Sequence, residues 1–219
     1  MGEKTAEFAL IDNYFRDLTN QHGVVVGIGD DGAIVHSDMS SQLVVATDTL
    51  VASVHFPSEA SAEEIATRAL CVNLSDMAAM GAVPKWFTLA LTLPTENTSK
   101  HWLRGFTKGL GYIASAFDVA LIGGDTTAGP LTISMTLIGE VPTGKSLLRS
   151  GAKPGDAIFV SGTLGDGAAA CGEVRLEGIR KADAVGVVHR HDAGGVDALV
   201  EHQGRQHRTL EQVGWRGAE

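Results

Sequence analysis

Two stretches with helical spacing of apolar residues, each followed by apolar runs of strand length, constrain the fold of this chain most. The first begins at a capping box formed by Ser61 and Glu64 and ends at Gly81. The second begins near residues 98–99 and keeps apolar residues on one face as far as Phe117. Runs typical of strands occupy 86–93, 119–122 and 131–141. This order predicts a mixed α/β (α+β) architecture.

Shorter elements are expected on both sides of this central region. The spacing predicts an amphipathic helix over 5–19, and strands over 24–28, 33–35, 43–46 and 157–160. The stretch 171–219 has poor periodicity and holds four of the eight histidines, so we expect it to bury little apolar surface. We therefore divide the chain into a first domain at 1–150 and an atypical remnant of a second α/β domain at 151–219.

Composition excludes several classes of protein. Hydrophobic residues make up 44% and charged residues 20% of the 219 residues, and no apolar run approaches the ~20 residues of a membrane span. The net charge of −9 argues against a nucleic-acid partner, and any phosphate ligand would need help from cations. Cys71 and Cys171 are too few for a disulfide framework, and Cys71 reads as a small core residue. With no apolar signal segment near the N-terminus, the chain is expected in the cytoplasm, without a membrane partner.

Two glycine-rich motifs match phosphate-binding patterns but lack the context that those patterns need. Residues 27–32 fit the dinucleotide pattern G-x-G-x-x-G, and residues 139–146 fit the Walker A pattern G-x-x-x-x-G-K-[ST]. Both patterns hold phosphate at the N-terminus of a helix that starts in the loop. A strand follows the first motif, and Gly151 and Pro154 leave barely one helical turn after the second. We interpret both motifs as loops between strands.

Five aspartates stand at expected strand ends or inside an apolar helix: Asp30, Asp31, Asp48, Asp76 and Asp125. Asp76 is the most informative, because a carboxylate in so apolar a helix needs a hydrogen-bond network or a cation as its partner. Asn73 lies one turn earlier on the same helical face and can share that site. Mg²⁺ prefers such oxygen ligands and is usually completed by substrate phosphates. A turn or a helix cap explains any single aspartate equally well, but the five together favour a metal site.

Five segments of the chain stand out, at 27–31, 47–56, 73–82, 123–130 and 149–156, and they include Gly-Ile-Gly-Asp-Asp at 27–31 and Asn-Leu-Ser-Asp-Met-Ala-Ala-Met-Gly-Ala at 73–82. In this order the five segments closely resemble the bacterial thiamine-monophosphate kinase family. The resemblance implies the fold shared with aminoimidazole ribonucleotide synthetase, in which strands of the N-terminal α/β domain pair with those of a partner subunit to form a homodimer. It also implies the reaction, in which ATP donates its γ-phosphoryl group to thiamine monophosphate and thiamine diphosphate is formed.

The resemblance also implies a set of site residues. The Mg²⁺ ligands would be Asp30, Asp31, Thr47, Asp48, Asp76 and Asp125. Gly124, Asp125 and Arg149 resemble ATP contacts, and His55 resembles a substrate contact. The alternatives are an exposed loop histidine for His55 and a surface salt bridge for Arg149.

The resemblance runs from about residue 7 to residue 170 and stops there. The family's second-domain motif, Asp-x-Ser-Asp-Gly, does not occur in the sequence. Three readings therefore stay open: a thiamine-monophosphate kinase, another ATP-dependent enzyme of the same superfamily, and a truncated chain that dimerises and binds Mg²⁺ and nucleotide without turnover. We expect 171–219 to be a frame-shifted or rearranged end, which the nucleotide sequence would test.

Overall fold

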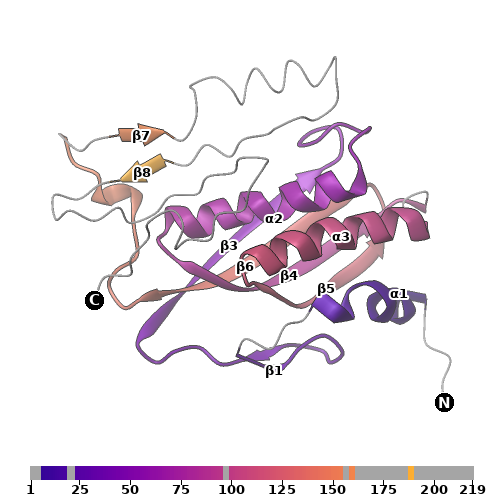
Figure 1. Cartoon of the computed structure of the whole chain (residues 1–219), viewed down its shortest axis with the longest axis horizontal. Coiled ribbons are helices and arrows are strands. Elements are labelled where there is room, and N and C mark those ends of the chain that lie inside the picture. Colours follow the sequence, from indigo (N-terminus) through magenta and orange to yellow (C-terminus); the bar gives the residue numbers. More distant parts are fainter. Residues whose placement is uncertain (1–5, 19–22, 96–98, 155–157, 161–186, 190–219) are drawn as a thin grey trace.

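A four-stranded sheet carries two long helices on one face (Figure 1). The computed structural model describes residues 6–18, 23–95, 99–154, 158–160 and 187–189. Across the sheet the strand order is β3 (Ser41–Val51), β6 (Thr132–Pro142), β4 (Val83–Leu93) and β5 (Ala120–Ala128). β6 runs antiparallel to both β3 and β4, whereas β4 and β5 are parallel. The expected mixed α/β class is confirmed.

The helices α2 (Ala62–Ala79) and α3 (Lys100–Ala116) bury their apolar faces on the sheet. In α3 the buried residues include Leu103, Phe106, Leu110 and Ile113, the face that the spacing predicts. The Oγ of Ser99 accepts a hydrogen bond from the Trp102 N–H at 3.2 Å and caps the start of α3. Between the helices and the sheet lies one core that includes Leu70, Met77 and Phe87.

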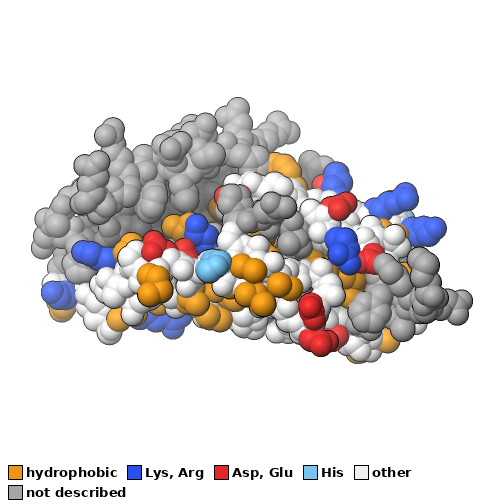
Figure 2. All heavy atoms as spheres, turned by 90° about the horizontal axis from the view of Figure 1, so that it is seen from below, with side chains coloured by type: hydrophobic (Ala, Val, Ile, Leu, Met, Phe, Trp, Pro, Cys, Tyr) orange, Lys and Arg blue, Asp and Glu red, His pale blue; other side chains and the backbone are white. Residues whose placement is uncertain are grey.

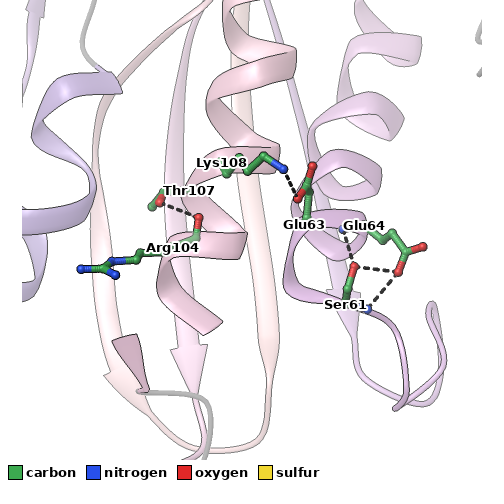
Figure 3. Close-up of polar contacts among 6 residues, drawn as sticks. All are labelled: Ser61, Glu63, Glu64, Arg104, Thr107 and Lys108. Carbon is green, nitrogen blue, oxygen red and sulfur yellow. Dashed lines mark hydrogen bonds and ion pairs between the residues drawn. The ribbon is translucent and has the colours of Figure 1, made fainter. Parts of the chain in front are cut away.

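The predicted capping box at the start of α2 is present (Figure 3). The Ser61 Oγ accepts from the Glu64 N–H at 3.3 Å, and the Glu64 carboxylate accepts from the Ser61 N–H at 2.9 Å. At the other end, Gly81 has a left-handed φ of 68° just beyond the last turn. Both ends of α2 are therefore where the sequence places them.

We expect Ser61→Ala to lower the free energy of unfolding by about 1 kcal/mol, because it removes the hydrogen bonds of the Ser61 hydroxyl to the Glu64 N–H and to the Glu64 carboxylate. Urea denaturation measures the change. Ser58→Ala is the matched control, since the Ser58 hydroxyl lies outside the helix and donates to its exposed neighbour Glu59. Equal midpoints for the two variants would contradict a stabilising role for the capping box.

Two glycines of α3 allow it to approach the first turn of α2 closely. A Cβ on Gly105 would lie 3.3 Å from the Ala62 Cβ, and a Cβ on Gly109 would overlap the carbonyl oxygen of Glu63. Beside this contact, the Lys108 ammonium pairs with the Glu63 carboxylate at 2.8 Å (Figure 3). The backbones of the two helices therefore touch at a point where no side chain fits.

The remaining elements are shorter. The helix α1 (Ala6–Tyr14) leads into a 3-10 turn (Arg16–Leu18), and the Phe15 ring meets Phe106 of α3 edge to face, with ring centroids 6.4 Å apart. On the face away from α2 and α3, the hairpin of β1 (Val24–Val26) and β2 (Ile34–Val35) packs against Trp86, Ala120 and Ile122. A second small sheet joins β7 (Ile158–Val160) to β8 (Val187–His189), and the sequence does not predict β8.

Two strands are longer than the apolar runs suggest. β3 continues through Thr47, Asp48 and Thr49, and β5 continues through Gly123, Gly124 and Asp125. The expectation that Asp48 and Asp125 stand at strand ends is therefore wrong, because backbone pairing with β6 and β4 continues past these poor strand formers. Most of the expected second-domain remnant lies outside the described residues, so the division at 150 stays a prediction.

Candidate active site

A buried amide brings Asp48 of β3 and Asp76 of α2 into one site. Asn73, which is fully buried, accepts a hydrogen bond from the Asp48 N–H through Oδ1 at 3.2 Å. Its Nδ2 donates to the Ala69 carbonyl oxygen at 2.9 Å. Both halves of the amide are therefore used inside the protein, and Asn73 ties α2 to β3. The expectation that Asn73 shares the site of Asp76 stays a prediction.

Asp76 lies at the exposed edge of α2, not within its apolar face. The cost of burying its charge is therefore smaller than the apolar sequence around it suggests. Partial desolvation nevertheless raises the pKa of Asp76, the nearby Asp48 carboxylate raises it further, and the Arg149 guanidinium lowers it. Asp48 and Arg149 thus both act electrostatically on Asp76, and the Leu147 N–H bond to the Met80 carbonyl oxygen at 3.0 Å holds the segment before Arg149 at the end of α2.

The other predicted metal ligands lie apart from this pair. The Thr47 hydroxyl bonds to the Thr136 hydroxyl at 2.8 Å, on the sheet face opposite to Asp48, because successive side chains of a strand alternate. Asp125 lies on β5, opposite Ala90 of β4. Two strands separate β5 from β3, so at the usual strand spacing β5 lies roughly 14 Å from β3.

Asp30 and Asp31 lie in the loop between β1 and β2, where the Asp31 N–H donates to the Asp30 carboxylate at 2.9 Å. Among the residues that the structure describes, no three histidine, cysteine, aspartate or glutamate side chains are close enough to hold one ion. Mg²⁺ usually takes one or two carboxylates and completes its shell with water and phosphate, which the Asp48 and Asp76 pair can satisfy. The larger set of six ligands stays a prediction.

Gly124 is required by the backbone at its position. A Cβ there would overlap the Leu89 carbonyl oxygen of the neighbouring strand β4. The spacing between β4 and β5 next to Asp125 therefore depends on a residue without a side chain.

His55 is held in a short loop after β3. The ring Nδ1 of His55 accepts a hydrogen bond from the backbone N–H of Val51 at 3.0 Å. The backbone N–H of His55 donates to the Val51 carbonyl oxygen at 2.9 Å. The imidazole is exposed at this point. The resemblance in sequence implies that His55 contacts the substrate, but the sequence does not indicate that the backbone N–H of Val51 holds the imidazole ring.

The Walker-like loop at 139–146 does not bind phosphate in the manner of a P-loop. Its first residues belong to β6, the Thr143 N–H donates to the Ser40 carbonyl oxygen, and the Gly144 N–H donates to the Gln42 side chain. No helix follows directly, only the 3-10 turn of three residues. The amides that a P-loop turns toward phosphate are engaged elsewhere, so the interpretation as a loop is confirmed.

Two further expectations are confirmed. The motif at 27–32 lies inside the antiparallel hairpin of β1 and β2, so no helix begins there to hold a pyrophosphate. Cys71 packs against the main core, and burial raises the pKa of its thiol to about 12. A thiol with so high a pKa is almost entirely protonated at neutral pH and does not act as a nucleophile.

Residues 29–141 match the family described as "AIR synthase related protein, N-terminal domain", and the chain belongs to this family. Within the family, its similarity is to thiamine-monophosphate kinases. It is 46% identical over 188 residues to the thiamine-monophosphate kinase of Salmonella typhimurium, covering 84% of this chain and 57% of that protein.

Solved structures agree with this assignment. The crystal structure of thiamine-monophosphate kinase from Stenotrophomonas maltophilia K279a aligns with a TM-score of 0.70 and 48% identity, over 80% of this chain and 55% of that one. A structure of AaThiL complexed with AMPPCP and TMP aligns with a TM-score of 0.59 and 33% identity, over 83% of this chain and 56% of that one. The chain therefore spans little more than half the length of these relatives.

Proposed function

We propose that this chain takes part in the ATP-dependent phosphorylation of thiamine monophosphate to thiamine diphosphate. The observation that carries the proposal is the convergence of Asp48, Asp76 and Arg149, since two carboxylates and a guanidinium provide for both a divalent cation and a phosphate. The likeness to a structure named as a complex with AMPPCP and TMP supports the same pair of substrates.

Asp48 and Asp76 would hold Mg²⁺, which neutralises charge on the phosphates when bound. Asn73 ties α2, which carries Asp76, to the backbone of Asp48, so the two elements that carry the carboxylates are joined. Arg149 adds a fixed positive charge beside them. Phosphoryl transfer needs positioning and charge neutralisation more than a covalent nucleophile, and these residues supply both. Gly124, Asp125 and the Asp30 and Asp31 loop belong to the proposal as further ATP and metal contacts.

The sheet face away from α2 and α3 is proposed as the homodimer surface. On β3 it exposes Leu43 and Val45, which are 50% and 62% accessible, next to the hydroxyl pairs Thr47 with Thr136 and Thr49 with Ser134. In a separate view of the molecule from below, at a right angle to the view of Figure 1, hydrophobic side chains are grouped near the middle of the surface (Figure 2). Exposed apolar residues on a sheet favour contact with a second copy of the chain over contact with water.

The described part of the chain has no helix that is long and apolar enough to span a membrane. A cytoplasmic location stays a prediction.

The test is formation of thiamine diphosphate from ATP and thiamine monophosphate by the purified 219-residue chain, with Mg²⁺ present or removed by EDTA. We expect turnover that requires Mg²⁺, is lost in Asp76→Asn and persists in Asp17→Asn, which removes an exposed carboxylate of the N-terminal 3-10 turn. Without turnover, Mg²⁺ and ATP that still raise Tm would favour the alternative of a binding chain that lacks its catalytic partner domain. If the chain shows no turnover and also binds neither Mg²⁺ nor ATP, both the proposed function and the alternative of a binding chain are contradicted.

A further inference from the structure

The loop that follows β3 is closed by reciprocal hydrogen bonds. The Val51 carbonyl oxygen accepts from the His55 N–H at 2.9 Å and from the Val54 N–H at 3.2 Å, and the Ser53 N–H donates to the Phe56 carbonyl oxygen at 2.8 Å. Leu50 and Phe56, at the two ends of the loop, are buried, with 4% and 5% accessibility. The loop is therefore fixed by its own backbone and anchored in the core.

These contacts determine which nitrogen of the His55 ring carries a proton. The Val51 N–H is a donor, and it lies 3.0 Å from His55 Nδ1. Nδ1 must therefore be the acceptor and carry no proton, which leaves the proton of the neutral ring on Nε2. The exposed edge of the imidazole is then a hydrogen-bond donor.

Ser53 has the backbone conformation that makes this loop possible at an energetic cost. Its φ is 62°, in the left-handed region that a residue with a Cβ adopts reluctantly. The Ser53 N–H bond to Phe56 closes the loop in that conformation. A strained residue beside an exposed, backbone-held histidine is typical of a functional site.

We propose that Ser53 is a positioning residue that keeps His55 as an Nε2–H donor to an acceptor atom of the phosphorylated substrate. Val51 is three residues along β3 from Asp48, so the backbone N–H that holds the His55 ring lies roughly 10 Å along the strand from Asp48. A ligand whose phosphate lies at the carboxylates and whose other end reaches His55 would touch both. The identity of this ligand rests on the proposed function, whereas the tautomer of the His55 ring does not depend on that function.

The first measurement is ¹⁵N NMR of the histidine rings in the ligand-free chain, with the His55 signals assigned by their loss in His55→Asn. We expect Nδ1 without a proton and Nε2 with one. Ser53→Gly, which adopts a positive φ without strain, should keep this pattern, whereas the β-branched Ser53→Val should replace it with the tautomer mixture of a free imidazole. The opposite tautomer in the original chain, or an unchanged pattern in Ser53→Val, would overturn the positioning role.

The second measurement is thiamine monophosphate binding by calorimetry, with ATP binding as the internal control. His55→Asn keeps an acceptor near the Nδ1 position for the Val51 N–H and loses the donor at Nε2, so Tm should change little while thiamine monophosphate binds about tenfold more weakly. Ser53→Val should weaken this binding similarly, Ser53→Gly should not, and ATP affinity should hold in all three. If His55→Asn binds thiamine monophosphate normally, the donor role is wrong. If the original chain binds none, the proposed function fails with it, while the NMR result still decides the state of the ring.

Discussion

Gly109→Ala should lower the free energy of unfolding by about 2 kcal/mol and Tm by about 4–8 °C. The added methyl group would overlap the Glu63 carbonyl oxygen and lie 3.0 Å from the Glu63 Cα. Neither atom moves easily, because the Ser61 and Glu64 capping box fixes this turn of α2. Overpacking of this kind costs roughly 3 kcal/mol, and the better helix propensity of alanine returns about 1 kcal/mol.

Gly111→Ala is the matched control for this prediction. It adds the same methyl group to the same helix, but the atom it would meet is the Leu18 Cδ2 at 2.9 Å, the end of a flexible side chain. We expect Gly111→Ala to be neutral or slightly stabilising in thermal and urea unfolding. A similar loss of unfolding free energy in both variants would mean that the close approach of α3 to α2 is not what excludes a side chain at Gly109.

Asp76→Asn should stabilise the metal-free chain while abolishing its stabilisation by Mg²⁺ and ATP. The folded-state pKa of Asp76 is raised above its ordinary value of 3.8, so folding favours the protonated form. That favourable contribution is present below pH 3.8 and is lost as pH rises through the folded-state pKa. At pH 7 the charged carboxylate is therefore a cost that asparagine removes. Because Asp76 is exposed, solvent screening keeps the gain below about 1 kcal/mol, or about 1–3 °C in Tm.

Thermal scans at pH 7 and pH 4, each with and without Mg²⁺ and ATP, test both halves of this prediction. Without ligand, Tm of Asp76→Asn should exceed that of the original chain at pH 7, and the difference should shrink toward pH 4. With ligand at a hundred times its Kd, the original chain should gain about 2.7 kcal/mol, and Asp76→Asn should gain none. Ligand shifts that remain intact in Asp76→Asn would remove Asp76 from the metal site.

The helices could be predicted from sequence because local interactions fix their ends. Ser61, Glu64 and Gly81 bound α2, and Ser99 begins α3, each through a hydrogen bond or backbone angle within a few residues. The full lengths of β3 and β5 could not be predicted in this way. Their polar and glycine-rich halves are strands because β6 and β4 pair with them, and such pairing leaves no mark in local sequence.

The candidate site was predictable in chemistry more than in geometry. The motif around Asp76 and the position of Arg149 indicate residues that the structure does bring together with Asp48. Spacing along the chain gives no means of knowing that Thr47 turns to the opposite face or that two strands separate Asp125 from β3. The anchoring of His55 by Val51 is likewise invisible in the sequence, because it depends on a left-handed Ser53.

The place of β6 in the sheet affects how the chain can fold during its synthesis. β6 lies between β3 and β4, yet it is the last of the four strands to be made, and Thr47 pairs with Thr136, which is 89 positions later in the chain. Until β6 has left the ribosome, β3 has no neighbouring strand within this sheet. Its unpaired backbone N–H and C=O groups can then pair with strands of other chains. We therefore expect slow folding with a late closing step, and a chain released before Pro142 should be prone to aggregation.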